Sequence, residues 1–433
     1  MSNAIRIGLL GLGTVGQSAV SIIDENRDRI EARAGGPLEI VRAVVRDTTR
    51  KRNIPKHVQL TTCFEQVVGA SDVDIVVEVM GGKKPATDLI LKALKGGQPI
   101  VTANKAVIAA SADRIFKLAR DRGVDVQFEA SVAGGIPIVR TLRNALVSDQ
   151  VTSIRGILNG TTNYMLQAMA HGRSYEVALK EAQEKGYAEA DPTLDVEGND
   201  AADKLAILMR LGFGVSVKPN RIETQGITNL PVEVFQDAER MGYRVKLVAE
   251  ALRGRGGEIQ GSVAPQFVAV GHQLSTIPGA QNAIFVGSRS LGQTVYQGLG
   301  AGAAATGSAV VADIIEVARA LRSGANGVVT LPEVLPGEFF GDGNEARAAF
   351  YIRLLVREKP GVLASLAGIL AKEGISIATL NQEEPELNQD GVEIVLTTHP
   401  ARFGDMKLAL GALKRVTMKG HMPCVLRIYS EQG

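Results

Sequence analysis

Short apolar runs alternate with helical patterns over residues 4–135. The first run, 5–10 (IRIGLL), is typical of a buried strand, and a helical pattern follows it to about residue 30. Further strand-like runs cover 39–45, 75–79, 99–102 and 124–128, with helical stretches between them. Strands that alternate with helices indicate a parallel sheet covered on both faces. We therefore expect residues 1–135 to form a doubly wound α/β domain of the Rossmann type.

The pattern changes between residues 136 and 302. Strand-like runs at 153–158, 221–226, 267–270 and 283–287 now mix with helical patterns at 175–185 and 201–211. This mixture predicts a separate α+β domain. A glycine- and alanine-rich loop, 298–308, then opens a helix, which we expect to return to the first domain over about residues 303–325.

The last hundred residues predict a linker and a small module. Residues 331–347 contain prolines, glycines and charges, which is typical of a linker. Residues 348–433 then follow the order strand, helix, strand, strand, helix, strand, at 350–356, 361–373, 375–381, 391–397, 402–415 and 422–429. This βαββαβ order predicts a ferredoxin-like module.

Composition excludes several classes of protein. The 433 residues are 45% hydrophobic and 22% charged with a net charge of +2, so no overall positive field exists to bind nucleic acid. Cys63 and Cys424 stand far apart, which argues against a disulfide framework or a cysteine zinc site. No run is long enough to span a membrane, and no basic leader precedes the first strand. We expect a cytoplasmic protein.

The turn after the first strand has the spacing of a dinucleotide-binding loop. It reads GLGTVG, with Gly11, Gly13 and Gly16 at the three glycine positions and Thr14 and Val15 between them. The first glycine permits a tight turn, the second a close approach of the backbone to a pyrophosphate, and the third close packing of helix on strand. Its place between a strand and a helix predicts a nicotinamide cofactor site.

The second strand bears on the choice of cofactor. A site for NAD carries an acid at the end of this strand, whereas here the strand ends in Arg46 and Asp47 and is followed by Arg50-Lys51-Arg52. Arg46 can pair with a 2′-phosphate through two nitrogens. The sequence favours NADP(H), with NAD(H) left possible through Asp47; a solvated surface turn is the simpler alternative.

Lysines and carboxylates follow two of the predicted elements. Lys105 comes directly after the strand at 99–102, at the sheet edge where open parallel sheets bind ligands. In the segment 186–211 several carboxylates crowd an irregular stretch, and Asp200 and Lys204 then lie on one face of a helix. Lys204 shares the apolar face of that helix, so its charge needs a partner, and Asp200 is the obvious one. On these residues alone, a structural salt bridge is the more probable interpretation.

Four blocks of the sequence, in order, resemble homoserine dehydrogenases. They are VTANKA (101–106), EASVAGGIP (129–137), LNGTTNY (158–164) and the segment 186–204. The resemblance implies reversible NAD(P)-dependent reduction of L-aspartate 4-semialdehyde to L-homoserine, a step of threonine, methionine and isoleucine biosynthesis. It implies proton exchange by Lys105 and Lys204, orientation of Lys204 by Asp200, and binding of the substrate ammonium by Glu189. It further implies substrate contacts from Asp195, Tyr187, Thr161 and the backbone around Gly160.

The same resemblance implies a monovalent cation and a cofactor-covering loop. Sodium would be held by Glu129 and the carbonyl groups of Val132, Gly134 and Ile136, with a structural role. Gly302, in the loop 298–308, would contact the cofactor. This loop departs from the family pattern, which has proline at the position of Ala305 and alanine at that of Gly307, so it puts cofactor affinity in question.

The C-terminal module resembles an ACT domain, a regulatory unit of amino-acid biosynthetic enzymes. The turn at 359–361 (KPG) follows Glu358, and the next strand begins at about residue 375. By resemblance, L-threonine is the expected effector and a homodimer or homotetramer the expected assembly. A dimerisation module without a ligand is the alternative.

Two rival functions share parts of this pattern. A phosphorylating semialdehyde dehydrogenase needs an activated cysteine, and neither Cys63 nor Cys424 has a base-rich setting. A non-catalytic sensor of amino acids and nucleotides would combine the same domains, but the presence of both lysines and the acid cluster argues against it.

Overall fold

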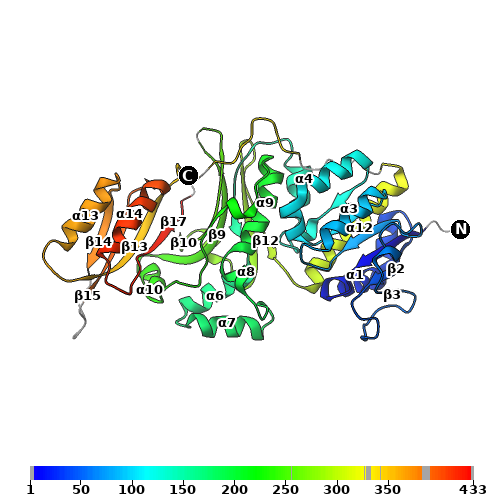
Figure 1. The fold of residues 1–433 in the computed structure, drawn as a ribbon, viewed down its shortest axis with the longest axis horizontal. Coiled ribbons are helices and arrows are strands. Elements are labelled where there is room, and N and C mark those ends of the chain that lie inside the picture. The colour runs from blue at the N-terminus through cyan, green and yellow to red at the C-terminus, as the bar shows by residue number, and fades with distance from the viewer. Residues whose placement is uncertain are drawn as a thin grey trace. The chain divides into compact units, whose positions relative to one another are not determined.

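The computed structural model describes residues 4–254, 256–325, 327, 333–341, 343–382 and 391–430. Contacts divide the chain into two compact units (Figure 1). Unit 1 consists of Met1–Thr152, Asp203–Arg221 and Phe285–Glu338, and unit 2 of Ser153–Ala202, Ile222–Ile284 and Phe339–Gly433. Among the described residues, no helix combines the length and the apolar character needed to cross a membrane.

Unit 1 contains the expected parallel sheet. Its strand order is β3-β2-β1-β4-β5-β6, and every neighbouring pair is parallel. The strands are β1 (Ile5–Leu10), β2 (Leu38–Val44), β3 (Gln59–Thr61), β4 (Ile75–Glu78), β5 (Ile100–Thr102) and β6 (Val126–Gln127). The order reverses at β1, so the doubly wound fold is confirmed and its ligand-binding edge lies beyond the carboxyl ends of β1 and β4.

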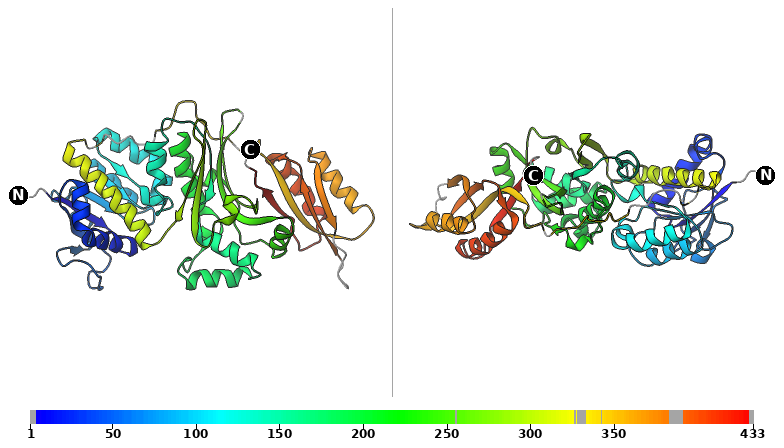
Figure 2. Two further views of the ribbon diagram at one scale, coloured as in Figure 1. Left: turned by 180° about the vertical axis from the view of Figure 1, so that it is seen from behind. Right: turned by 90° about the horizontal axis from the view of Figure 1, so that it is seen from above.

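Helices cover both faces of this sheet. One face is covered by α1 (Thr14–Glu25), α2 (Arg27–Ala34) and α12 (Ala303–Ser323), and these share one apolar core with β1, β2 and β4. The other face carries α3 (Ala86–Lys95) and α4 (Lys105–Arg122), as Figure 2 shows from above. The helix predicted after residue 302 thus completes the Rossmann domain. The helix predicted to residue 30 is interrupted at Asn26, which ends α1.

Unit 1 also contains several short helical turns and one further strand. They are η1 (Phe64–Gln66), η2 (Glu129–Ser131), α5 (Ile138–Arg140), η3 (Thr141–Ala145), η4 (Pro219–Arg221) and β12 (Gly292–Leu299). The helix α9 (Asn199–Phe213) begins in unit 2 and continues into unit 1.

Unit 2 is built on one large sheet in the order β11-β7-β9-β10-β17-β13-β15-β14, with β8 beside β10. Its first strands are β7 (Val151–Ile157), β8 (Glu223–Thr224), β9 (Tyr243–Arg253), β10 (Ile259–Ala269) and β11 (Gln281–Ser288), the first and last of which continue into unit 1. Its first helices are α6 (Gly160–Ala170), α7 (Tyr175–Glu184), α8 (Thr193–Val196), α10 (Glu233–Arg240) and α11 (Gln273–Thr276).

The sequence pattern does not predict β9 or the first half of β10. Both strands are covered on both faces, so the period-two alternation of a half-exposed strand is missing. In β9, the apolar residues Val245, Val248, Ala249 and Leu252 even follow the spacing of a helix. Pairing with its neighbour stabilises the extended conformation of β9, because β9 and β10 pair along their whole length.

The C-terminal module has the predicted βαββαβ order. Its elements are β13 (Arg347–Arg357), α13 (Val362–Lys372), β14 (Ile377–Gln382), β15 (Gly391–Thr398), the short β16 (Ala401–Arg402), α14 (Phe403–Val416) and β17 (Cys424–Ile428). Alternate residues of β13, from Phe350 to Val356, pack with both helices into an apolar core. The residues between them face the opposite side of the sheet.

This module shares its sheet with the rest of unit 2. Strand β17 pairs in parallel with β10, with Gln266 opposite Arg427 and Phe267 opposite Ile428. On the outer face of β13, the hydroxyl of Tyr351 and a guanidinium nitrogen of Arg353 donate to the buried carboxylate of Asp237, on α10, at 2.5 and 2.6 Å. The module is therefore joined to unit 2 by backbone and by buried polar side chains.

The predicted linker at 331–347 lies partly outside the described residues. The described part is held in place: the N–H of Leu335 donates to the carbonyl of Gly214, and the N–H of Ile259 donates to that of Phe339. The boundaries proposed for the domains remain predictions.

Candidate active site

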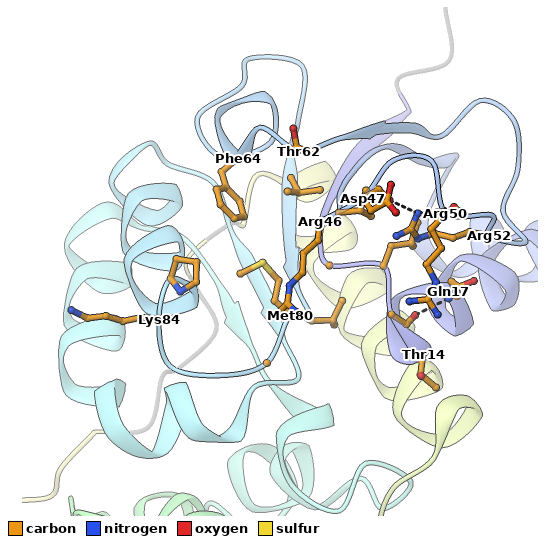
Figure 3. A pocket seen from close by; sticks show the side chains of 18 residues that line it. Thr14, Gln17, Arg46, Asp47, Arg50, Arg52, Thr62, Phe64, Met80 and Lys84 are labelled. Atoms are coloured by element: carbon orange, nitrogen blue, oxygen red, sulfur yellow. Dashed lines mark hydrogen bonds between the residues drawn. The ribbon is translucent and has the colours of Figure 1, made fainter. Parts of the chain in front are cut away.

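A cavity of about 860 Å³ lies at the carboxyl ends of β1, β2 and β4. It is lined by the turn after β1, by the end of β2 and by the segment after β4, and Figure 3 shows its side chains. From the turn come Gly11, Leu12, Gly13, Thr14 and Gln17; from the other two come Arg46, Asp47, Arg50, Arg52, Val79, Met80, Gly81 and Lys84. Its position is the one at which open parallel sheets bind ligands.

The glycines of the turn have three different surroundings. Gly11 has φ +99°, and an added Cβ would lie 2.9 Å from the carbonyl oxygen of Val79. A Cβ on Gly16 would lie 2.8 Å from the carbonyl oxygen of Gly11, so this glycine lets α1 pack closely. A Cβ added to Gly13 would meet no atom within 4 Å, which leaves room for a ligand against the backbone. Thr14 lines the cavity, whereas Val15 packs against the apolar core.

Three arginines occupy the end of the cavity beside β2. In Figure 3, Arg46 extends toward Met80, while Arg50 and Arg52 lie near Gln17. The carboxylate of Asp47 accepts hydrogen bonds from the hydroxyl and the N–H of Thr49, at 2.7 and 2.8 Å, and these lower its pKa. A nitrogen of Arg52 donates to the backbone carbonyl of Asp47 at 2.9 Å. This end of the cavity is suited to a phosphate.

Lys105 and Gly302 are not among the residues that line this cavity. Lys105 is half-buried and is the first residue of α4, directly after β5 and the capping residue Asn104. Gly302, with φ +116°, immediately precedes α12, and no atom lies within 4 Å of the position of its missing Cβ. The space beside its backbone is therefore open, and its contact with a cofactor stays a prediction.

Two of the predicted carboxylates share one donor in unit 2. The amide nitrogen of Asn159 donates to Asp195 at 2.7 Å and to Asp200 at 2.8 Å. The amide oxygen of the same residue caps α6, where it accepts from the N–H of Thr162. Asp200 is buried and Asp195 half-buried. Asn159 therefore fixes both carboxylates to the start of α6, which sequence reasoning did not find because it considered only the backbone at this position.

The other predicted substrate residues lie around the same helix. The hydroxyl of Thr161 donates to the carbonyl of Tyr187 at 2.6 Å, and the ring of Tyr187 lies 5.3 Å from that of Tyr164. Gly160 begins α6 so close to the carbonyl of Ala280 that no side chain would fit. Glu189 is exposed, and its backbone carbonyl accepts from Gln183. The predicted substrate residues 160, 161, 187 and 195 thus lie near one another with the predicted catalytic residue Asp200, while the Glu189 side chain is exposed.

Lys204 lies one helical turn after Asp200 in α9. It is 9% exposed and follows the two fully covered residues Ala201 and Ala202, while Ile207 and Leu208 follow it. A lysine so buried on an apolar helix face is costly unless its ammonium is paired. The i, i+4 spacing from Asp200 places both charges on one face of α9.

The segment predicted to bind sodium forms a buried loop in unit 1. The carboxylate of Glu129 accepts from the N–H groups of Val139 and Arg140, at 2.9 and 2.8 Å, while burial raises its pKa. The N–H groups of Gly134 and Gly135 donate to the carbonyls of Gly300 and Leu299. The predicted cation loop is therefore tied to the loop that leads into Gly302.

A buried ion cluster joins this loop to α12. Asp313 accepts from the N–H of Glu129 at 2.8 Å and from a guanidinium nitrogen of Arg140 at 2.9 Å. Burial, assisted by the neighbouring Glu129, raises the pKa of Asp313 to about 8, while Arg140 opposes this shift. Among the described residues no group of three His, Cys, Asp or Glu side chains could hold a metal ion, so a cation here would depend on backbone carbonyls.

Three family models match consecutive parts of the chain. The model "Homoserine dehydrogenase, NAD binding domain" matches residues 11–129, "Homoserine dehydrogenase" matches 137–315, and "ACT domain" matches 350–417. Together they include the cavity, the lysines, the carboxylate cluster and the C-terminal module.

Several relatives match nearly the whole chain. A homoserine dehydrogenase from Bacillus subtilis is 38% identical over 427 residues, 95% of this chain and 96% of that relative. One from Neisseria gonorrhoeae is 39% identical over 417 residues, 95% of each chain. A crystal structure of a homoserine dehydrogenase from Thiobacillus denitrificans has a TM-score of 0.92 at 38% identity and covers 99% of both chains. A hyperthermophilic archaeal homoserine dehydrogenase in complex with NADPH has a TM-score of 0.62 at 28% identity, over 72% of this chain and 97% of that one.

Proposed function

The chain belongs to the homoserine dehydrogenase family of NAD(P)-dependent oxidoreductases, and from this premise we propose which of its residues carry out the interconversion of L-homoserine and L-aspartate 4-semialdehyde. The observation that carries the proposal is Lys204, a buried lysine one turn after the buried Asp200, whose carboxylate Asn159 also holds. A purely structural ion pair has no need of the second lysine, Lys105, at the ligand-binding end of β5.

The two lysines handle the proton of the reaction. The nicotinamide, when bound, supplies or accepts the hydride. As the semialdehyde is reduced, an ammonium group of Lys105 or Lys204 donates a proton to the carbonyl oxygen, and in the reverse direction the neutral amine removes the hydroxyl proton. Asp200 orients Lys204, and the positive charge of both lysines stabilises negative charge that develops on the oxygen.

The carboxylates recognise the amino-acid part of the substrate. Glu189 binds the substrate ammonium, with Asp195 as a second acidic contact, while Tyr187, Thr161 and the backbone at Gly160 complete the pocket. The exposed position of Glu189 supports a role in binding a ligand from solution. The bond from Asn159 to Asp195 supports a fixed position for the second acid.

The test is the exchange Lys204→Ala. We expect kcat for homoserine oxidation to fall by several orders of magnitude while the NADPH dissociation constant, measured by fluorescence titration, changes little. Lys180→Ala, at an exposed lysine of α7, is the matched control. Turnover near that of the parent in the Lys204→Ala variant would contradict the assigned role, and a parent inactive with both cofactors would favour the non-catalytic sensor.

We propose that the enzyme prefers NADP(H) to NAD(H). Arg46, Arg50 and Arg52 supply positive charge where the 2′-phosphate of an adenosine ribose would lie. The acid that would bind the ribose hydroxyls of NAD, Asp47, is already bonded to Thr49. Both features favour a phosphate over a free hydroxyl.

Replacing Arg46 or Arg50 by Ala tests this preference. Loss of a charge-assisted hydrogen bond of about 1.5–3 kcal/mol predicts an increase of about 10- to 100-fold in KM for NADP, with little change in KM for NAD. Steady-state kinetics with each cofactor measure the ratio. Equal effects on both cofactors would show that these arginines contribute only general attraction.

A monovalent cation is the second proposed ligand of unit 1. Sodium would be bound by Glu129 and the carbonyl groups of Val132, Gly134 and Ile136, and would brace the loop that is hydrogen-bonded to Leu299 and Gly300. A ligand that binds only the folded state raises its melting temperature. We expect a higher Tm in sodium chloride than in tetramethylammonium chloride at equal ionic strength; identical melting curves would argue against the site.

For the C-terminal module we propose regulation by L-threonine, together with assembly as a homodimer or homotetramer in the cytoplasm. The ACT match supports an amino-acid effector, and exposed apolar residues of β12, Val295 and Leu299, support a contact between subunits. Two unpaired cysteines, Cys63 and Cys424, support a reducing compartment. Kinetics with and without threonine, and sedimentation analysis, test the first two proposals.

A further inference from the structure

A second carboxylate of unit 1 is fully buried beside the residues that lead into Lys105. Glu78 is the last residue of β4 and is 0% exposed. Parallel pairing places Glu78 opposite Thr102, the last residue of β5. Among the described residues, no lysine, arginine or histidine forms an ion pair with Glu78. A buried carboxyl group without an ion-pair partner is costly unless hydrogen bonds satisfy its oxygens.

One oxygen of Glu78 leads to Lys105. The hydroxyl of Thr102 donates to Oε2 of Glu78 at 2.7 Å, and the same hydroxyl accepts from the backbone N–H of Asn104 at 3.0 Å. Asn104 caps α4, whose first residue is Lys105. A chain of two hydrogen bonds therefore connects the buried carboxylate to the residue before this lysine.

The other oxygen of Glu78 leads to the cofactor cavity. Oε1 accepts from the backbone N–H of Met80 at 2.9 Å and from the amide of Asn104 at 3.4 Å. The same amide donates to the carbonyl of Gly82 at 2.7 Å. Met80 and Gly81 line the cavity, so the segment after β4 and the start of α4 meet at one carboxylate.

We propose that Glu78, acting through Thr102 and Asn104, is a positioning residue that fixes Lys105 relative to the wall of the cofactor cavity. This inference rests on the proposed role of Lys105. A buried carboxylate that accepts from a hydroxyl at 2.7 Å and from a backbone N–H at 2.9 Å suits the task, because it joins two strand-end segments that would otherwise move independently. A reacting group displaced by about 1 Å loses on the order of 100-fold in rate.

Each oxygen of Glu78 forms one arm of hydrogen bonds: Oε2 with Thr102, and Oε1 with Met80 and Asn104. Mutations can distinguish the two arms. Thr102→Val removes the hydroxyl with little change of shape, so it breaks the connection through Oε2 and leaves the bonds of Oε1 to Met80 and Asn104 in place; Thr102→Ser keeps the hydroxyl. Glu78→Ala breaks both arms. Asp74→Asn is the matched control, because Asp74 precedes the same strand at its opposite end, where it pairs with Arg6.

The expected results differ between the variants. Thr102→Val lowers kcat by about 10- to 100-fold, with KM for homoserine and the NADPH dissociation constant nearly unchanged, and Thr102→Ser restores kcat to within about threefold of the parent. Glu78→Ala lowers kcat by a similar factor and also weakens NADPH binding. Asp74→Asn changes neither quantity, even if it lowers the melting temperature.

Equal kcat values for Thr102→Val and Thr102→Ser would overturn the inference, as would NADPH binding in Glu78→Ala equal to that of the parent. A parent without activity on homoserine refutes the proposed function instead. In that case the NADPH titrations still test the arm from Glu78 to the cavity, so the two failures are distinguishable.

Discussion

Lys246 is a buried lysine outside the candidate active site. It lies on β9 in unit 2, where its ammonium donates to the amide oxygen of Asn163 and to the carbonyl of Ile277, both at 2.9 Å. Burial lowers the pKa of Lys246 to about 8, and the nearby charge of Arg244 acts in the same direction. Asn163 belongs to α6, so this lysine holds the helix that carries Asn159 at its start.

This pKa predicts a pH dependence of stability. Between pH 8 and the unfolded-state value of 10.5, the unfolded chain keeps its proton on Lys246 while the folded chain has lost it. The free energy of unfolding therefore rises with pH across this window, by up to about 1.4 kcal/mol per unit from this group. Below pH 8 the full cost of the buried charge is present.

Chemical denaturation from pH 7.5 to 10.5 tests this, with Lys246→Met compared with the parent. Above pH 8 we expect the unfolding free energy of the parent to rise relative to that of Lys246→Met, so that the value for the parent minus that for the variant increases with pH. The exposed Lys180→Met is the control, and its difference from the parent should stay constant. A Lys246→Met curve parallel to the parent's would show that the lysine titrates normally.

At the scale of elements, the close contact of α1 with α12 depends on one glycine. A Cβ added to Gly307 would lie 2.5 Å from the hydroxyl oxygen of Ser18 and 2.9 Å from its Cβ. Gly307 is one of the positions at which we expect this chain to depart from the family pattern. Its space is filled by a neighbouring helix, so the glycine permits close packing rather than mobility.

Two glycine exchanges in helices should therefore have opposite effects. Gly307→Ala gains helix propensity but overpacks the contact with α1, so we expect a net loss of about 1–3 kcal/mol in unfolding free energy. Gly411 lies in an exposed part of α14, and a Cβ added to it would meet no atom within 4 Å. Gly411→Ala should therefore raise the unfolding free energy by about 0.5–1 kcal/mol. Denaturant unfolding measures both free energies. A stabilising Gly307→Ala would mean that α1 and α12 can move apart at this contact without a loss of stability.

The elements also show where sequence reasoning succeeds. Five of the six Rossmann strands were predictable because each is an apolar run flanked by glycine or polar turns, as at Gly11 and Asn104. The short β3, with the sequence QLT, was not predicted because it has no such run. The strand β12 was not, because its exposed sequence GQTVYQGL carries little hydrophobic signal. Lys105, Asp195, Asp200 and Lys204 could be named from motifs. The bonds of Asn159 and the burial of Glu78 could not, since they depend on segments brought together only by the fold.

At the scale of the whole chain, buried charges join the C-terminal module to the rest of unit 2. Asp237 is 2% exposed and receives bonds from Tyr351 and Arg353 of β13 and from Arg240 of its own helix. A second group lies at β17, where Arg427 donates to Ser262 at 2.5 Å and to Glu250 at 3.3 Å. Each group includes side chains of the module and of β9, β10 or α10.

Arg353→Met should be strongly destabilising. It leaves Asp237 buried with one cationic partner fewer, and breaking a buried pair in this way costs about 3–5 kcal/mol. Arg402→Met removes an exposed pair with Glu345 and should cost less than about 1 kcal/mol. Thermal unfolding of the full chain distinguishes the two variants. Equally small losses of stability in both would show that water replaces the hydrogen bond that Asp237 loses.

The pairing of β17 with β10 has a consequence for biosynthesis. Residues 266 and 427 face each other across the sheet, although about 160 positions separate them in the chain. The N-terminal end of a chain emerges first from the ribosome, and domains generally fold as they emerge. The stretch of β10 that pairs with β17, at Gln266 and Phe267, must therefore stay unpaired at this edge until residues 424–428 have been synthesised.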